Sequence, residues 1–84
     1  MALARKGSRK IVVEGSEYRW TVSADDEAGV GIVVEDHNKP ACRLVKWVDH
    51  GLVISPAVVR GVIVEALAIG WRPREPGPDF VRSR

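Results

Sequence analysis

Alternating apolar and polar residues divide the first half of the chain into short segments typical of β-strands. The clearest alternation lies at 17–24, where Tyr18, Trp20 and Val22 are separated by more polar residues. Successive side chains of a strand point to opposite faces of a sheet, so these three residues predict a core-facing side. Similar apolar patterns predict three further strands, at 9–14, 30–35 and 41–48.

Glycines mark two special positions among these strands. Gly15 and Ser16 separate the first two strands, and a two-residue turn with glycine in its first position favours type II′. We therefore predict a type II′ hairpin at Gly15-Ser16. Gly31 lies inside the third strand, where glycine usually marks a bulge or a close approach of another group to the backbone.

The spacing of apolar residues then changes and predicts an α-helix over 56–69. Ser55 is a typical N-cap, and Pro56 suits the first helical position because its missing N–H is not needed there. Gly70 can adopt the left-handed conformation that ends a helix, and Pro73 prevents its continuation. Both ends of the helix are therefore marked in the sequence.

This helix has two apolar faces. At 100° per residue, the broader face predicts the contact with the sheet and comprises Val58, Val59, Val62, Ile63, Ala66 and Ile69. The opposite face carries Ala57, Gly61, Val64 and Ala68, bordered by the only charged residues of the helix, Arg60 and Glu65. A solvent-exposed helix face normally carries more charge than this second face does.

Two interpretations of the second face remain open. Small residues on an exposed face can be harmless, because alanine is the best helix former. Glycine, however, costs about 1 kcal/mol relative to alanine in a helix, so Gly61 favours a face against which something packs. The occupant could be a second copy, the C-terminal segment or another partner. We favour a homodimer, because two-fold dimers are the commonest soluble oligomers.

The remaining elements complete an α+β fold. Three prolines in 72–78 favour an extended connector, and Phe80 with Val81 predicts a short last strand within 79–82. The expected order is β-β-β-β-α-β: an antiparallel four-stranded β-meander covered by one α-helix at about 56–69, with a short C-terminal strand. We expect a flexible basic arm at 1–8 and a single α+β domain at 9–82.

Composition indicates an ordinary globular domain. Among its 84 residues, 45% are hydrophobic and 29% charged, and the net charge is only +2. This balance does not by itself predict nucleic-acid binding. The single cysteine, Cys42, cannot form an internal disulfide and is consistent with a reducing cytoplasm. The first residues lack the apolar run of a signal peptide, and we expect no membrane association.

The sequence offers no constellation of catalytic or metal-binding residues. His37 and His50 each follow an aspartate in predicted loops at opposite ends of strand 41–48, about 25 Å apart. Turn-forming aspartates explain both pairs. Cys42 has no flanking base, and we interpret it as a small core residue. We therefore predict a non-enzymatic protein without a cofactor, a metal or an identifiable small-molecule ligand.

A nucleic-acid-binding module is the alternative hypothesis. Basic side chains can hold phosphates while an exposed aromatic ring stacks on a base. The outer face of the sheet and the basic arm would supply these groups: Arg5, Lys6, Arg9, Arg19, Arg43 and Trp47.

Two stretches also carry a resemblance. One follows the pattern K-I-V-V-x-G-x-x-Y-x-W from Lys10 to Trp20, and the other combines Ile54-Ser55-Pro56 with Gly70-Trp71-x-Pro73. Together they resemble a group of small bacterial proteins of unassigned function. The resemblance implies a stand-alone bacterial domain and carries no activity over to this chain.

Overall fold

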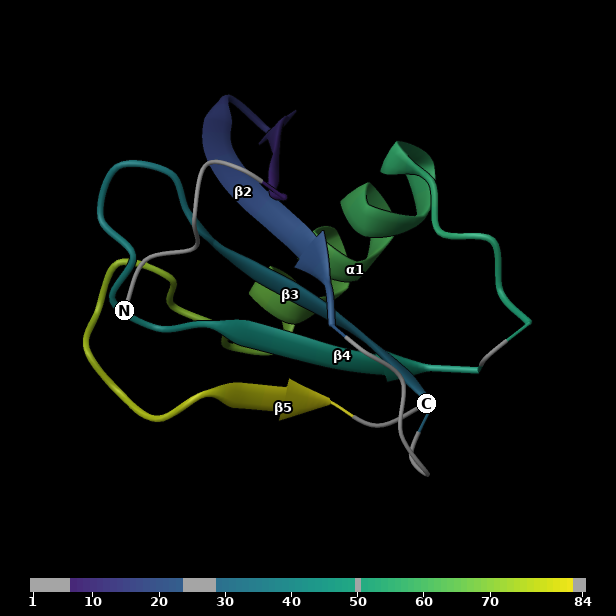
Figure 1. Ribbon diagram of the computed structural model, residues 1–84. Coiled ribbons are helices and arrows are strands. Elements are labelled where there is room, and N and C mark those ends of the chain that lie inside the picture. The colour runs from purple at the N-terminus through teal and green to yellow at the C-terminus, as the bar shows by residue number, and fades with distance from the viewer. Residues whose placement is uncertain (1–6, 24–28, 50, 83–84) are drawn as a thin grey trace.

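The computed structural model describes residues 7–23, 29–49 and 51–82, which form one sheet and one helix (Figure 1). The elements in chain order are β1 (Arg9–Val13), β2 (Ser16–Val22), β3 (Val30–Asp36), β4 (Leu44–Val48), α1 (Pro56–Ala68) and β5 (Phe80–Arg82). The predicted α+β fold is therefore confirmed, including its element order and the C-terminal strand.

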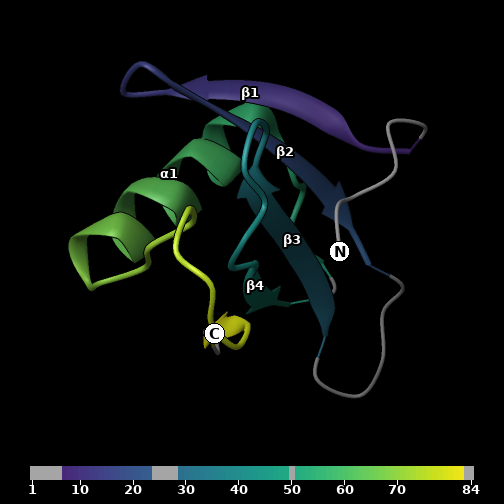
Figure 2. The same cartoon turned by 90° about the vertical axis from the view of Figure 1, so that its left-hand side faces the viewer.

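The five strands lie in the sheet in the order in which they occur in the chain. Neighbouring strands from β1 to β4 are antiparallel, as a meander requires. β5 pairs with β4 in parallel, with Leu44 opposite Phe80, because the chain crosses over through α1 before returning to the sheet. α1 lies on one side of the sheet, as Figure 2 shows.

The β1–β2 hairpin differs from the prediction by one residue. Val13 pairs with Ser16, so the two turn residues are Glu14 and Gly15 rather than Gly15 and Ser16. Both have positive φ, 51° at Glu14 and 81° at Gly15, which defines a type I′ turn rather than type II′. The predicted type II′ turn is therefore wrong, because the register of the strands places the non-glycine Glu14 in the first turn position.

The core lies between α1 and the face of the sheet to which the predicted apolar residues point. Its fully or almost fully buried members include Tyr18, Trp20, Ile32, Val34, Leu44, Val59, Ile63, Ala66 and Trp71. Val22 is an exception, with 42% of its surface exposed at the end of β2. Ile69 is 48% exposed, contrary to its predicted core position, because α1 ends at Ala68 and Ile69 has left the helical conformation.

Both predicted caps of α1 are present. Ser55 Oγ accepts a hydrogen bond from the Val58 N–H at 3.4 Å. At the other end Gly70 has φ of 115°, and the Trp71 N–H donates to Ala66 O at 2.9 Å. The Gly70 N–H also donates to Leu67 O, which completes a Schellman motif. This helix end turns Trp71 back into the core, where the centre of its ring lies 5.8 Å from the centre of the Tyr18 ring.

The chain before β4 is held by the segment that follows α1. Strand β4 begins at Leu44 and not at Ala41, because the N–H groups of Ala41 and Cys42 donate to Pro73 O rather than to β3. The indole Nε1 of Trp71 donates to Cys42 O at 3.1 Å. Cys42 itself packs partly buried against the core, as predicted. The two segments thus fix each other in position.

Candidate interaction surfaces

The outward face of α1 is open to solvent. All six residues of the predicted interface are exposed: Ala57, Arg60, Gly61, Val64, Glu65 and Ala68. A methyl group at Gly61 would meet nothing within 4 Å, and Val64 keeps 39% of its surface exposed. Of the C-terminal segment, one of the three predicted occupants, residues Phe80–Arg82 instead pair beside β4 at the edge of the sheet and do not lie over this face. We call the exposed surface formed by these six residues the outer helix face.

The two charged residues of the outer helix face lean to opposite sides. Arg60 Nη1 donates to Val12 O on β1 at 3.4 Å, whereas Glu65 Oε1 lies 4.0 Å from Lys46 Nζ on β4. The side chain of Glu65 remains largely exposed. Arg60 therefore marks the β1 flank of the helix, and Glu65 marks the β4 flank.

On the other side of the sheet, Trp47 packs against its own neighbours. Gly31 lies directly opposite it in the register, and a Cβ at Gly31 would be 3.3 Å from the Trp47 ring. The same Cβ would be 2.5 Å from Ser23 Oγ. The predicted special role of Gly31 is therefore a close approach, and Trp47 is half-buried rather than a free stacking platform.

Arg19 and Arg43 lie on the same side of the sheet as Trp47, which faces away from α1 and which we call the outer sheet face. Both arginines hydrogen-bond to other side chains there. Arg43 donates two hydrogen bonds to Asp79, the shorter from Nη2 to Oδ2 at 2.8 Å, and this contact raises the pKa of Arg43. Arg19 donates to Ser8 Oγ at 3.1 Å and pairs in register with Glu35, which is only 2% exposed. The carboxylates of Asp79 and Glu35 therefore offset the positive charges that Arg43 and Arg19 would offer to phosphates on this face.

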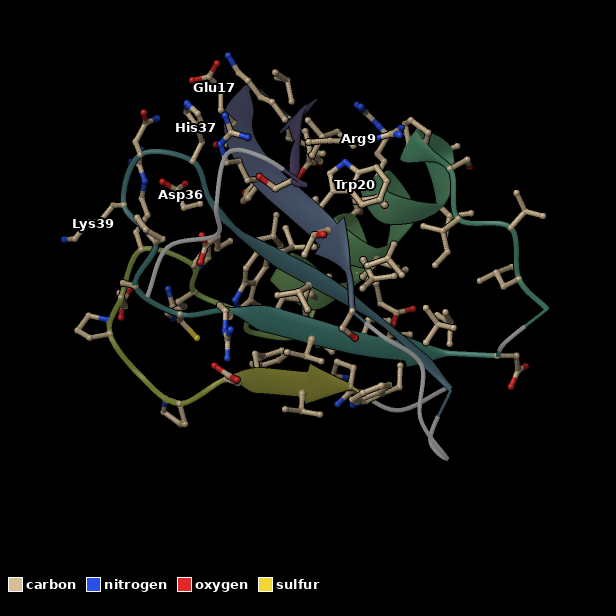
Figure 3. The ribbon with its side chains drawn as sticks, viewed as in Figure 1. Arg9, Glu17, Trp20, Asp36, His37 and Lys39 are labelled. Carbon is tan, nitrogen blue, oxygen red and sulfur yellow. The ribbon has the colours of Figure 1, made fainter. Side chains whose placement is uncertain are left out.

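Arg9 lies on the opposite side of the sheet from Arg19, Arg43 and Trp47. It is paired with core-facing Trp20, and its guanidinium carbon lies 5.8 Å from the centre of that ring (Figure 3). The pair lines a surface hollow of about 330 Å³ together with Gly7, Thr21, Val22 and Ile54. Among the predicted nucleic-acid residues, Arg19, Arg43 and Trp47 therefore share one face of the sheet and Arg9 lies on the other, while Arg5 and Lys6 lie outside the described residues.

A polar group gathers around the loop that follows β3, at the other end of the sheet from Arg9 (Figure 3). Asp36 is almost completely buried, and its Oδ2 accepts hydrogen bonds from the N–H groups of Asn38 and Lys39 at 3.0 and 2.7 Å. Its Oδ1 lies 3.4 Å from Arg74 Nε. Asp36 is therefore occupied in shaping the turn, as proposed for the Asp-His pairs; His50 lies outside the described residues.

Glu17 and Lys10 form an ion pair beside this loop, across the β1–β2 hairpin. The Lys10 ammonium holds the pKa of the Glu17 carboxyl below its usual value, first by hydrogen bonding and then by charge. Both side chains are substantially exposed, so the pair is a surface contact.

The described residues show no metal site, and comparisons of the chain with known proteins find no match. Within residues 7–23, 29–49 and 51–82, no three His, Cys, Asp or Glu side chains are grouped as a metal site requires. In the same part of the chain no helix has both the length and the apolar character to cross a membrane. No protein-family model, curated protein or solved structure matches the chain.

Proposed function

We propose that this chain is a small non-enzymatic protein that acts by association and forms a homodimer through the outer helix face. The observation that carries the proposal is that Ala57, Gly61, Val64 and Ala68 are all exposed and carry no charged or polar side chain. Phe80–Arg82 pair with β4 and do not lie over this face, which supports a second copy or another protein as its occupant.

Packing physics supports a close helix partner at this face. Gly61 lowers helix stability by about 1 kcal/mol relative to alanine, and among the described residues no neighbour requires its small size. Small residues let the backbone of another helix approach closely. Burial of Val64 in that contact would remove apolar surface from water, at about 25 cal/mol per Å². A partner thus explains both residues.

The proposal also includes a cytoplasmic location and a bacterial origin. A cytoplasmic location is supported by Cys42, which is a free thiol in the described chain. A bacterial origin is supported by the resemblance of the hairpin and capped-helix sequences. The nucleic-acid alternative loses support, since Arg43 is engaged by Asp79 and Arg9 lies on a different face from Trp47.

The test is the mass of the protein in solution. By light scattering at micromolar concentration, wild type is expected to have the mass of two chains. Val64→Glu is expected to have the mass of one chain, because it places a charge at the centre of the contact. Val53→Glu is the matched control, since Val53 is an exposed valine in the loop before α1, and this variant should remain dimeric. A monomeric wild type overturns the proposal.

A further inference from the structure

We propose that the two copies of α1 pair in parallel, about a two-fold axis that runs along the helices. This inference rests on the proposed homodimer and specifies its geometry. Residues 57, 61, 64 and 68 recur at spacings of four, three and four, which is the spacing of an apolar seam between paired helices. We call these four residues the seam.

The flanks of the seam carry opposite charges. At 3.6 residues per turn, Arg60 and Glu65 each lie about 70° from the centre of the seam, on opposite sides. The contacts of the single chain show the same separation, because Arg60 reaches β1 and Glu65 reaches toward Lys46 on β4. The outer helix face is therefore positive along one flank and negative along the other.

Orientation decides which flanks meet. When two copies pair in parallel, opposite flanks face each other, so Arg60 approaches the partner's Glu65 and the same contact recurs by symmetry. When they pair antiparallel, like flanks meet, and arginine faces arginine while glutamate faces glutamate. Charges beside an apolar seam set the orientation of helix pairs in this way. Charge complementarity thus favours the parallel arrangement.

The distances within a parallel pair suit this contact. Arg60 and Glu65 are five residues apart, a rise of about 7.5 Å along the helix, which two long side chains can span. Alanine and glycine at three of the four seam positions allow the helix axes to approach toward the lower end of the usual range of about 8–10 Å. In the single chain their contacts are long, 3.4 Å to Val12 O for Arg60 and 4.0 Å to Lys46 for Glu65.

Disulfide trapping tests the orientation directly. In a Cys42→Ala background with unchanged circular dichroism, Ala57→Cys alone and Ala68→Cys alone should each form a cross-linked dimer. The two copies of each residue meet in a parallel pair and lie far apart in an antiparallel one. Glu75→Cys, exposed in the connector after α1, is the control and should stay uncross-linked.

Charge reversal supplies an independent measurement. Arg60→Glu alone and Glu65→Arg alone should each weaken dimerisation about tenfold, because two attractions become two repulsions. The double variant should restore dimerisation to nearly the wild-type constant. If cross-links form only in mixtures of the two cysteine variants, or if the reversals have no effect, the dimer stands and parallel pairing is overturned. A monomeric wild type overturns both proposals.

Discussion

The ring of Trp47 packs across the sheet onto Gly31, so closely that a single methyl group at Gly31 would lie 3.3 Å from the ring. This contact fixes the tryptophan against the outer face of the sheet. It also explains why a glycine stands between the β-branched residues Val30 and Ile32 of β3.

Gly31→Ala should destabilise the protein by about 1–3 kcal/mol, because the new methyl group overpacks a well-filled site. Ser23 Oγ is the nearest obstacle at 2.5 Å, so Ser23→Ala combined with Gly31→Ala should recover part of the loss. Urea unfolding of wild type and of these two variants measures both effects. An alanine at position 31 without cost would show that Trp47 is free to move away.

Replacement of Glu14 by asparagine should stabilise the hairpin by about 1 kcal/mol. Glu14 has φ of 51°, a left-handed conformation that is costly for glutamate and tolerated by asparagine. Gly15→Ala, which forces a side chain onto φ of 81°, should have the opposite sign. Thermal unfolding distinguishes the two. Equal melting temperatures for wild type and Glu14→Asn would contradict the type I′ assignment.

Alkaline pH should lower the stability of the folded protein through Tyr18. Burial raises the pKa of its phenol above the ordinary value of 10.0, so the folded state keeps a proton that the unfolded state releases. The resulting stability is fully present below the ordinary pKa and is lost as pH rises through the higher, folded-state pKa. Phenolate absorbance reports this group alone, since Tyr18 is the single tyrosine. Tyr18→Phe should remove this part of the pH dependence of unfolding.

Binding to nucleic acid should be weak and insensitive to Trp47. Arg43 is neutralised by Asp79, and Arg19 lies beside Glu35, so the outer sheet face offers little net charge to phosphates. Fluorescence anisotropy with mixed single-stranded oligonucleotides at low and high salt measures this. Tight binding that falls steeply with salt and drops in both Arg19→Ala and Trp47→Ala would favour the nucleic-acid module instead.

Local patterns predicted the elements well because their causes are local. Ser55 and Gly70 act on neighbouring backbone groups, and the alternation around Tyr18 and Trp20 needs only the pleat of one strand. The start of β4 was not predictable in this way. It depends on Pro73 O, which accepts from Ala41 and Cys42 across more than 30 residues.

For the candidate surfaces too, features with local causes were predictable and features that depend on distant residues were not. The exposure of the outer helix face followed from helical periodicity, although no pattern could exclude the C-terminal segment as its cover. Arg9 lies on the core-facing side of the sheet, apart from Arg19 and Arg43. A signal was present in the sequence, because Arg9 alternates in phase with Ile11 and Val13. Partners such as Asp79 for Arg43 required the fold itself.

The parallel pairing of β5 has a consequence for solubility. Without Phe80–Arg82, strand β4 would be the last of the sheet and would present the unpaired backbone groups of Leu44–Val48 to solvent. Such an open edge is a template for addition of strands from other chains. The final three-residue strand thus protects the sheet against aggregation, and it can do so only after the helix has brought the chain back beside β4.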